Sequence, residues 1–248
     1  MRVPLSLRSK LAVAFLLILA PVLGVLVYDY LDNYGRVLDT LTNGQAHTTE
    51  TLAAYLDAAF DQAISVGEAV ALDPVIRELS SRNPSFLDPY LARYIKLYPQ
   101  YEDMNVWDAA GNNAGTSTLL PPGQPRPTIA DRQHFQRAMA TGQPSVSGVI
   151  ISRINGRPTS AVAVPIKDQS GHPFGVITLL IDFDAVAARL QGVSLAPSQS
   201  AWATDRTGRA AFFTGKPSLT WEERDFSGYP AVRDALSRGQ FSSSKRSA

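Results

Sequence analysis

The stretch from Asp131 to Asp182 carries the clearest hydrophobic pattern in the chain, and its first part has a helical period. Between Asp131 and Ala140, three apolar side chains recur on one helical face, namely Phe135, Ala138 and Met139. Arginine and glutamine residues occupy most of the remaining positions. The spacing predicts a short amphipathic helix with one buried face.

After this helix the pattern changes to that of β-strands. Three stretches are rich in β-branched or alternating apolar residues: Ser145–Arg153, Thr159–Ile166 and Phe174–Phe183. The segments that separate them, Ile154–Arg157 and Asp168–His172, combine Asn or Asp with Gly, as hairpin turns do. We therefore expect a helix followed by a three-stranded antiparallel meander, which is an α+β arrangement.

Weaker patterns precede and follow this unit. Before it we expect short helices at Asp73–Leu79 and Phe86–Leu97, a strand-turn-strand unit at Asp103–Ser117 and a Pro- and Gly-rich loop at Leu119–Thr128. After it we expect a helix at Ala185–Leu190, a linker at Ser198–Ser200, a second strand-turn-strand unit at Ala201–Phe213 and a last helix at Tyr229–Ser237. The turn after Asp205 echoes the one after Asp108, which suggests an internal repeat.

The N-terminal region is the most apolar part of the chain. Leu11–Tyr28 carries no charge and is just long enough to cross a bilayer core of about 30 Å as a helix. Cations precede it at Arg2, Arg8 and Lys10, and the first acid is Asp29, so the positive-inside rule leaves residues 1–10 in the cytoplasm. The competing interpretation is a cleaved signal peptide, but no small-residue cleavage site separates the apolar run from the next helical segment.

Helical spacing of apolar residues continues from Leu31 to Val70, interrupted only at Asn43-Gly44. One interpretation is a long stalk helix that rises from the membrane. The alternative is a helix that only packs on a core. Both predict the same apolar stripe, so the sequence leaves the choice open.

Composition and motifs exclude several classes of protein. The net charge of +1 gives no basic face for nucleic acid, and the absence of cysteine excludes disulfides and thiol chemistry. His47, His134 and His172 lie far apart with no carboxylates clustered around them, so we expect no metal site. The chain has no Gly-x-Ser-x-Gly elbow, phosphate loop or dinucleotide fingerprint. We therefore expect no catalytic residues, no cofactor and no enzyme activity in this chain.

Several short motifs follow one another in a characteristic order. They are Asp131-Arg132 with Phe135, the serines at 145 and 147, Ile151-Ser152-Arg153 before Gly156, Ala163-Val164-Pro165-Ile166, and Gly175-Val176-Ile177 to Ile181-Asp182. In this order they resemble the membrane-distal module of the double Cache family, the extracytoplasmic sensor domains of bacterial transmembrane receptors. The resemblance implies a stalk helix with a PAS-like antiparallel-sheet module over residues 31–190. It also implies a second, truncated membrane-proximal module over residues 198–248.

The resemblance also implies a ligand site. In amino-acid-sensing members an Arg-x-Trp-Tyr run binds the ligand carboxylate, and here Arg132 matches while His134 and Phe135 replace the aromatic residues. An aspartate that takes the ligand ammonium is replaced by Ser152, and a neutral serine cannot offset a buried ammonium. Free α-amino acids are therefore poor candidates, and we expect a small carboxylate-bearing ligand. The expected ligand-binding residues are Arg132, His134, Phe135, Ser152, Arg153 and Asp182. Arg132 could instead form a structural pair with Asp131 or Asp182.

The function implied by the resemblance is ligand sensing in the bacterial inner membrane, with a single N-terminal anchor and the bulk of the chain outside the cytoplasm. The output domain of such a receptor would be a histidine kinase, a chemoreceptor coiled coil or a cyclic-dinucleotide enzyme. The stalk helix would mediate a homodimer. The alternatives are a membrane-anchored periplasmic enzyme and a ligandless dimerisation module.

Overall fold

The computed structural model describes residues 50–78, 84–121, 123–191, 200–216 and 218–238. The described residues from 55 onwards belong to one compact unit. The expected membrane anchor, Leu11–Tyr28, and the first part of the stalk lie outside the described residues. Among the residues that the structure describes, no helix combines the length and the hydrophobicity needed to span a bilayer. Residues 50–71 are helical, in agreement with the helical spacing in this part of the expected stalk.

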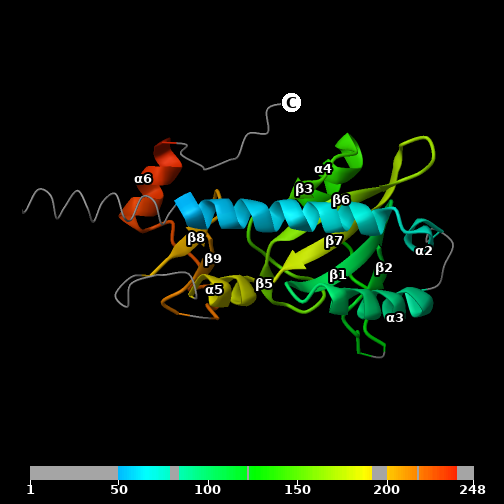
Figure 1. Cartoon of the computed structure of the whole chain (residues 1–248), viewed down its shortest axis with the longest axis horizontal. Helices are drawn as coiled ribbons and strands as arrows, with labels where there is room; N and C mark the ends of the chain where they lie inside the picture. The colour runs from blue at the N-terminus through cyan, green and yellow to red at the C-terminus, as the bar shows by residue number, and fades with distance from the viewer. Residues whose placement is uncertain (1–49, 79–83, 122, 192–199, 217, 239–248) are drawn as a thin grey trace, which may run out of the picture. The chain divides into compact units, whose positions relative to one another are not determined.

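The core of the unit is a five-stranded antiparallel sheet (Figure 1) with the order β2-β1-β7-β6-β3. Its strands are β1 (Tyr101–Asp108), β2 (Asn113–Thr116), β3 (Ser145–Val146), β6 (Ala161–Lys167) and β7 (Pro173–Ile181). The expected meander is present as β3, β6 and β7. The strand-turn-strand unit before it, β1 and β2, extends the same sheet because β1 pairs with β7.

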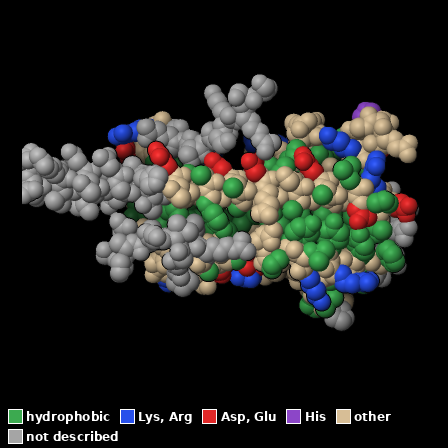
Figure 2. Space-filling view, viewed as in Figure 1, with side chains coloured by type: hydrophobic (Ala, Val, Ile, Leu, Met, Phe, Trp, Pro, Cys, Tyr) green, Lys and Arg blue, Asp and Glu red, His purple; other side chains and the backbone are tan. Residues whose placement is uncertain are grey.

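Helices cover both faces of this sheet, so its central strands are buried on both sides. On one face Gly67 of the first helix approaches so closely that a Cβ there would lie 2.6 Å from Val164 Cγ2. Helix α3 (Pro84–Tyr94) packs on β2, and η2 (Ile95–Leu97) continues it. Hydrophobic side chains gather between the first helix and α3 on the surface (Figure 2). A short helix, α2 (Pro74–Arg77), links the two.

The opposite face carries α4 (Gln133–Thr141), the helix that the sequence predicts at Asp131–Ala140. Phe135 and Ala138 of α4 are buried and pack with Trp107, Ala163 and Val176 of the sheet, and Met139 is partly buried against them. Gly142 ends the helix in the left-handed conformation with φ 63°, which glycine adopts without steric cost. Arg132 occupies the N-cap, so its side chain begins beside the first turn rather than within it.

Two expected strand boundaries were wrong. Ser145–Arg153 is not one strand, because it divides at Gly148 into β3 and β4 (Ile150–Ile151), and β4 pairs with β5 (Pro158–Thr159) in a separate small sheet. Phe183 does not end β7 but begins α5 (Phe183–Gln191). The reason is Asp182, whose Oδ1 accepts hydrogen bonds of 3.0 Å from the N–H groups of Asp184 and Ala185 and so caps the helix.

The internal repeat suggested by the sequence has a consistent structure. In the turns after Asp108 and Asp205, the aspartate Oδ1 accepts hydrogen bonds of 2.8 to 3.0 Å from the backbone N–H groups two and four residues later. The glycine three residues after each aspartate has φ near +80°, at 81° for Gly111 and 82° for Gly208. Such a turn requires Gly because other residues are strained at this φ. The two turns are 97 residues apart.

The same offset of 97 residues relates longer segments. Adding 97 to the residue numbers of α4 gives those of α6 (Pro230–Arg238). The same addition makes β1 correspond to β8 (Trp202–Thr204) and β2 to β9 (Ala210–Phe213). Gly111 O accepts a hydrogen bond from Ile129 N, and Gly208 O accepts the equivalent bond from Phe226 N. Phe226 and Val232 are buried in a small core of their own, where Ile129 and Phe135 stand in the first module. The described residues between 200 and 238 therefore repeat part of the first module. Their assignment to a membrane-proximal module stays a prediction.

Candidate ligand site beside helix α4

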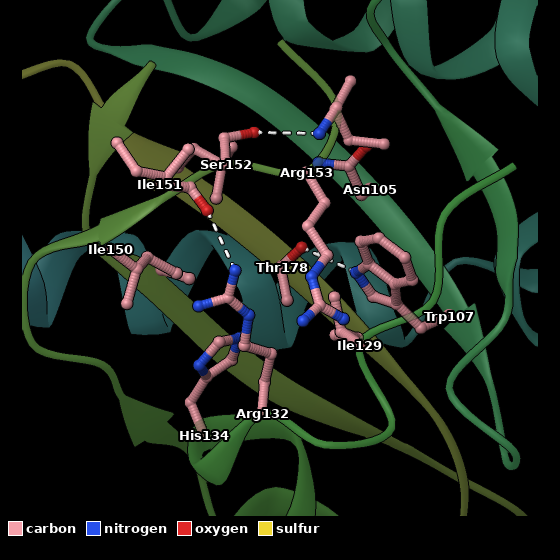
Figure 3. A pocket seen from close by; sticks show the side chains of 13 residues that line it. Asn105, Trp107, Ile129, Arg132, His134, Ile150, Ile151, Ser152, Arg153 and Thr178 are labelled. Atoms are coloured by element: carbon pink, nitrogen blue, oxygen red, sulfur yellow. Dashed lines mark hydrogen bonds between the residues drawn. The ribbon is translucent and has the colours of Figure 1, made fainter. Parts of the chain in front are cut away.

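A small cavity lies between the α4 face of the sheet and the segment that carries β4 (Figure 3). The sheet contributes Asn105, Trp107 and Thr178, and the segment 150–154 forms the opposite wall. The cavity volume is about 20 Å³. This is room for roughly one water molecule, so any larger ligand requires the wall to move.

Arg132 enters this cavity from the N-cap of α4 and is partly buried. Its Nη2 donates a hydrogen bond of 3.1 Å to the backbone oxygen of Ile151 (Figure 3). Within the described part of the chain, it forms no ion pair with Asp131 or Asp182, the two partners that a structural role would use. Asp131 instead pairs with Arg153, through two contacts of 2.7 Å. Burial and the nearby Arg153 charge lower the pKa of Arg132, and Asp131 acts in the opposite direction without offsetting them.

His134 lies in the first turn of α4 with only 4% of its surface exposed. Burial, followed by the charge of Arg132, lowers the pKa of His134 to about 4. The imidazole is therefore neutral at physiological pH. In this form it offers one hydrogen-bond donor and one acceptor without adding charge to the cavity.

The sheet wall supplies buried polar groups. Trp107 Nε1 donates to Thr178 Oγ1 at 2.8 Å. Asn105 Nδ2 donates to Asp103 Oδ2 at 3.1 Å, whereas Asn105 Oδ1 is buried and has no hydrogen-bond partner among the described residues. A buried acceptor without a donor costs free energy.

The structure brings four of the six expected site residues together around this cavity: Arg132, His134, Ser152 and Arg153. Phe135 does not reach it and packs in the core instead. Asp182 lies at a different cavity, where it caps α5. Ser152 is buried, and its hydroxyl oxygen accepts from Ile154 N at 3.2 Å, so it also shapes the turn.

Sequence reasoning missed Asn105, Trp107 and Thr178. Asn105 and Trp107 are two residues apart on β1, and Thr178 lies on β7, where it pairs directly with Asn105. Strand alternation places Asn105 and Trp107 on one face, and it could have marked them as polar or amphipathic residues that face α4. Among the described residues, no group of three or more histidine or acidic side chains is arranged so that it could hold a metal ion.

Comparison with solved structures identifies the class of protein that has this fold. The similar structures are extracellular sensor domains of histidine kinases and ligand-binding domains of chemoreceptors. The predicted resemblance to Cache-type sensor domains is thus confirmed for the fold. No family model matches the sequence, and no curated protein matches it.

Three structures illustrate the likeness. The extracellular domain of rpHK1S-Z16, described as a histidine kinase, has a TM-score of 0.62 and 23% identity, over 79% of this chain and 80% of that one. The sensor domain of the Vibrio cholerae histidine kinase DctB has a TM-score of 0.60 and 20% identity, over 71% and 67%. The ligand-binding domain of the Campylobacter jejuni chemoreceptor Tlp3, in complex with L-valine, has a TM-score of 0.54 and 13% identity, over 79% of each chain.

Proposed function

We propose that this chain is the extracytoplasmic ligand-sensing region of a bacterial membrane receptor. The support is a fold shared with sensor domains, together with a small cavity on the α4 face of the sheet that is lined by Arg132 and other polar side chains among apolar ones. An N-terminal helix over Leu11–Tyr28 would hold it at the inner membrane. The receptor would belong to the histidine kinases, the chemoreceptors or the cyclic-dinucleotide enzymes, and a homodimer through the stalk helix would carry the signal inward.

The ligand of the proposed sensor is a small molecule with an anionic group, and a carboxylate fits best. The observation that carries this proposal is Arg132, a partly buried guanidinium that donates to a backbone oxygen and to no carboxylate among the described residues. A planar guanidinium binds a carboxylate through two parallel hydrogen bonds. The adjacent first turn of α4 has free backbone N–H groups and a favourable helix dipole.

Binding would replace the contact between Arg132 and Ile151. A carboxylate is a stronger acceptor for a guanidinium than a neutral carbonyl, so the ligand would compete successfully for Nη2. Because the cavity of about 20 Å³ has no room for such a ligand, the segment 150–154 would move outward on binding. His134 and Ser152 would then supply neutral hydrogen-bonding groups beside the carboxylate.

The experiment is a thermal-shift screen of the purified full chain with mono- and dicarboxylates, followed by calorimetry with the ligand that stabilises it most. A ligand at a hundredfold excess over Kd should add about 2.7 kcal/mol to the stability. Arg132→Ala should then weaken binding by about 2 to 5 kcal/mol, which is at least about 30-fold in Kd. Arg132→Lys should also weaken it, because the charge remains but the planar fork is lost.

Arg137→Ala is the matched control, since Arg137 lies on the same helix and is exposed. It should leave the affinity unchanged. An unchanged affinity of Arg132→Ala, combined with a lower melting temperature, would assign Arg132 to structure. If no carboxylate stabilises the wild-type chain, the proposed ligand class is wrong.

A further inference from the structure

A second and larger cavity, of about 190 Å³, lies away from the α4 site. Its walls come from β1, from the start of α5 and from the segment after β9. A dry cavity of about 150 Å³ is known to accommodate a benzene-sized molecule, so this one has room for roughly six to eight non-hydrogen atoms. Nothing in the proposed function uses it.

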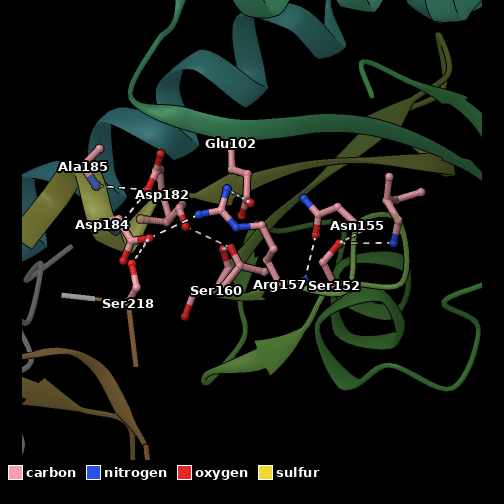
Figure 4. A network of polar contacts seen from close by, with 12 residues as sticks. Glu102, Ser152, Asn155, Arg157, Ser160, Asp182, Asp184, Ala185 and Ser218 are labelled. Carbon is pink, nitrogen blue, oxygen red and sulfur yellow. Dashed lines mark hydrogen bonds and ion pairs between the residues drawn. The ribbon is translucent and has the colours of Figure 1, made fainter. Parts of the chain in front are cut away.

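Three carboxylates line this second cavity: Glu102, Asp182 and Asp184. Arg157 lies among them and pairs with Glu102 at 2.7 Å and with Asp184 at 3.2 Å (Figure 4). Burial raises the pKa of Glu102, although Arg157 acts in the opposite direction. Arg157 therefore pairs with two of the three carboxylates and does not offset the charge of all three.

Asp182 is the acid that Arg157 does not pair with in the described structure. Its Oδ1 is occupied by the two backbone N–H groups that it caps in α5 (Figure 4). Those two bonds use one of its carboxylate oxygens, and Asp182 lines the cavity. A ligand cation placed beside Asp182 would be attracted to its carboxylate.

Arg224 also lines this cavity and carries a positive charge. It is 4% exposed, and Nη1 donates to the backbone oxygens of Ala210 and Ala211. Among the described residues no carboxylate lies within ion-pair distance of this guanidinium, although Asp184 is near enough to raise its pKa while burial lowers it. A nearly fully buried cation without an ion-pair partner would gain from a ligand anion.

We infer that this cavity is a second binding site, for a small zwitterion whose ammonium group contacts Asp182 and whose carboxylate contacts Arg224. Each charge of such a ligand would meet a side chain of opposite charge that forms no ion pair among the described residues. A simple anion would be repelled by the excess of carboxylates, and a simple amine would leave Arg224 unsatisfied. The cavity volume limits the ligand to a compact molecule.

The test is calorimetry of the purified full chain with glycine, β-alanine and γ-aminobutyrate, a series that extends the distance between the two charges and contains about five to seven non-hydrogen atoms. Propylamine carries the ammonium group alone and is the matched probe for this cavity, whereas a carboxylate alone would also bind at the proposed Arg132 site. At least one zwitterion should bind, and propylamine should bind at least about tenfold more weakly. Asp182→Asn should weaken the zwitterion at least about tenfold, because asparagine keeps the helix cap but removes the charge.

Asp168→Asn is the control variant, since Asp168 makes a comparable turn between β6 and β7 and lines neither cavity. It should leave zwitterion binding unchanged, as should Arg132→Ala at the α4 site. Absence of binding by all three zwitterions would overturn the inference. So would binding that Arg132→Ala abolishes and Asp182→Asn leaves intact, which would place the zwitterion in the first cavity. Equal affinity of propylamine would refute the role of Arg224.

Discussion

Acidification should destabilise this protein through one buried side chain, His134. The pKa of this imidazole is about 4 in the folded chain and 6.5 as the reference value. Above pH 6.5 it is neutral in both states and has no effect. Between pH 6.5 and pH 4 the unfolded chain binds the proton and the folded chain does not, so the stability falls as the pH falls. Below pH 4 both states are protonated and the loss is complete.

The size of the effect is set by the difference between the two pKa values. Each pKa unit corresponds to about 1.4 kcal/mol, so the titration of His134 lowers the free energy of unfolding by about 3 kcal/mol in total. About 2 kcal/mol of this loss falls between pH 7 and pH 4.5. Buried Asp103 and Glu102 act in the opposite direction, because burial raises their pKa values. The total pH profile therefore mixes these contributions. The difference between wild type and a His134 variant isolates one of them.

The assay is urea unfolding of wild type and His134→Gln at several values between pH 7 and pH 4.5. The variant will have a different stability at pH 7, but it should lose about 2 kcal/mol less than wild type on acidification. His172→Gln, at an exposed turn, is the matched control and should behave as wild type does. Parallel profiles for wild type and His134→Gln would show that the imidazole is not held neutral by burial.

Two further predictions concern the turns and the topology. Gly111→Ala should destabilise the chain more than Gly171→Ala, by about 1 kcal/mol or more in urea unfolding. Both glycines have φ above +80°, but only at Gly111 would a Cβ meet backbone, 2.7 Å from Ala130 N; equal losses would show that the backbone conformation alone sets the cost. For the anchor, a reporter fused after Ala248 should be active only outside the cytoplasm, and the protein should remain in the membrane fraction, whereas a shortened soluble form would indicate a signal peptide.

The periodic parts of the fold were predictable from the sequence. The spacing of Phe135 and Ala138 indicates a helix that buries one face, and the continuous apolar run after Phe174 indicates a strand buried on both faces. The break at Gly148 was not predictable from periodicity. A Cβ at that position would lie 2.6 Å from Asp205 Oδ2, which also accepts a hydrogen bond from Val149 N, so the break depends on a residue 57 positions away.

The candidate site was predictable only in part, for a similar reason. Arg132 and His134 belong to one helix, so a motif can identify them together. The opposite wall depends on the register between β1 and β7, which places Asn105 against Thr178. Register is a property of pairing between distant segments, and no local pattern in either strand specifies it. Asp182, also expected to bind the ligand, lies at the second cavity and caps α5, and no local pattern separates it from the residues beside Arg132.

The offset of 97 residues has a consequence for how binding arose in this molecule. If a single ancestral module was duplicated, its two copies began with the same pocket helix. The position of Arg132 in the first copy corresponds to Tyr229 in the second, and that of His134 corresponds to Ala231. The copies kept the aspartate turn, the glycine at positive φ and the buried face of the helix. They differ at the residues proposed to contact a ligand, so the arginine proposed to bind an anion is present in the first copy and has no counterpart at the corresponding position of the second.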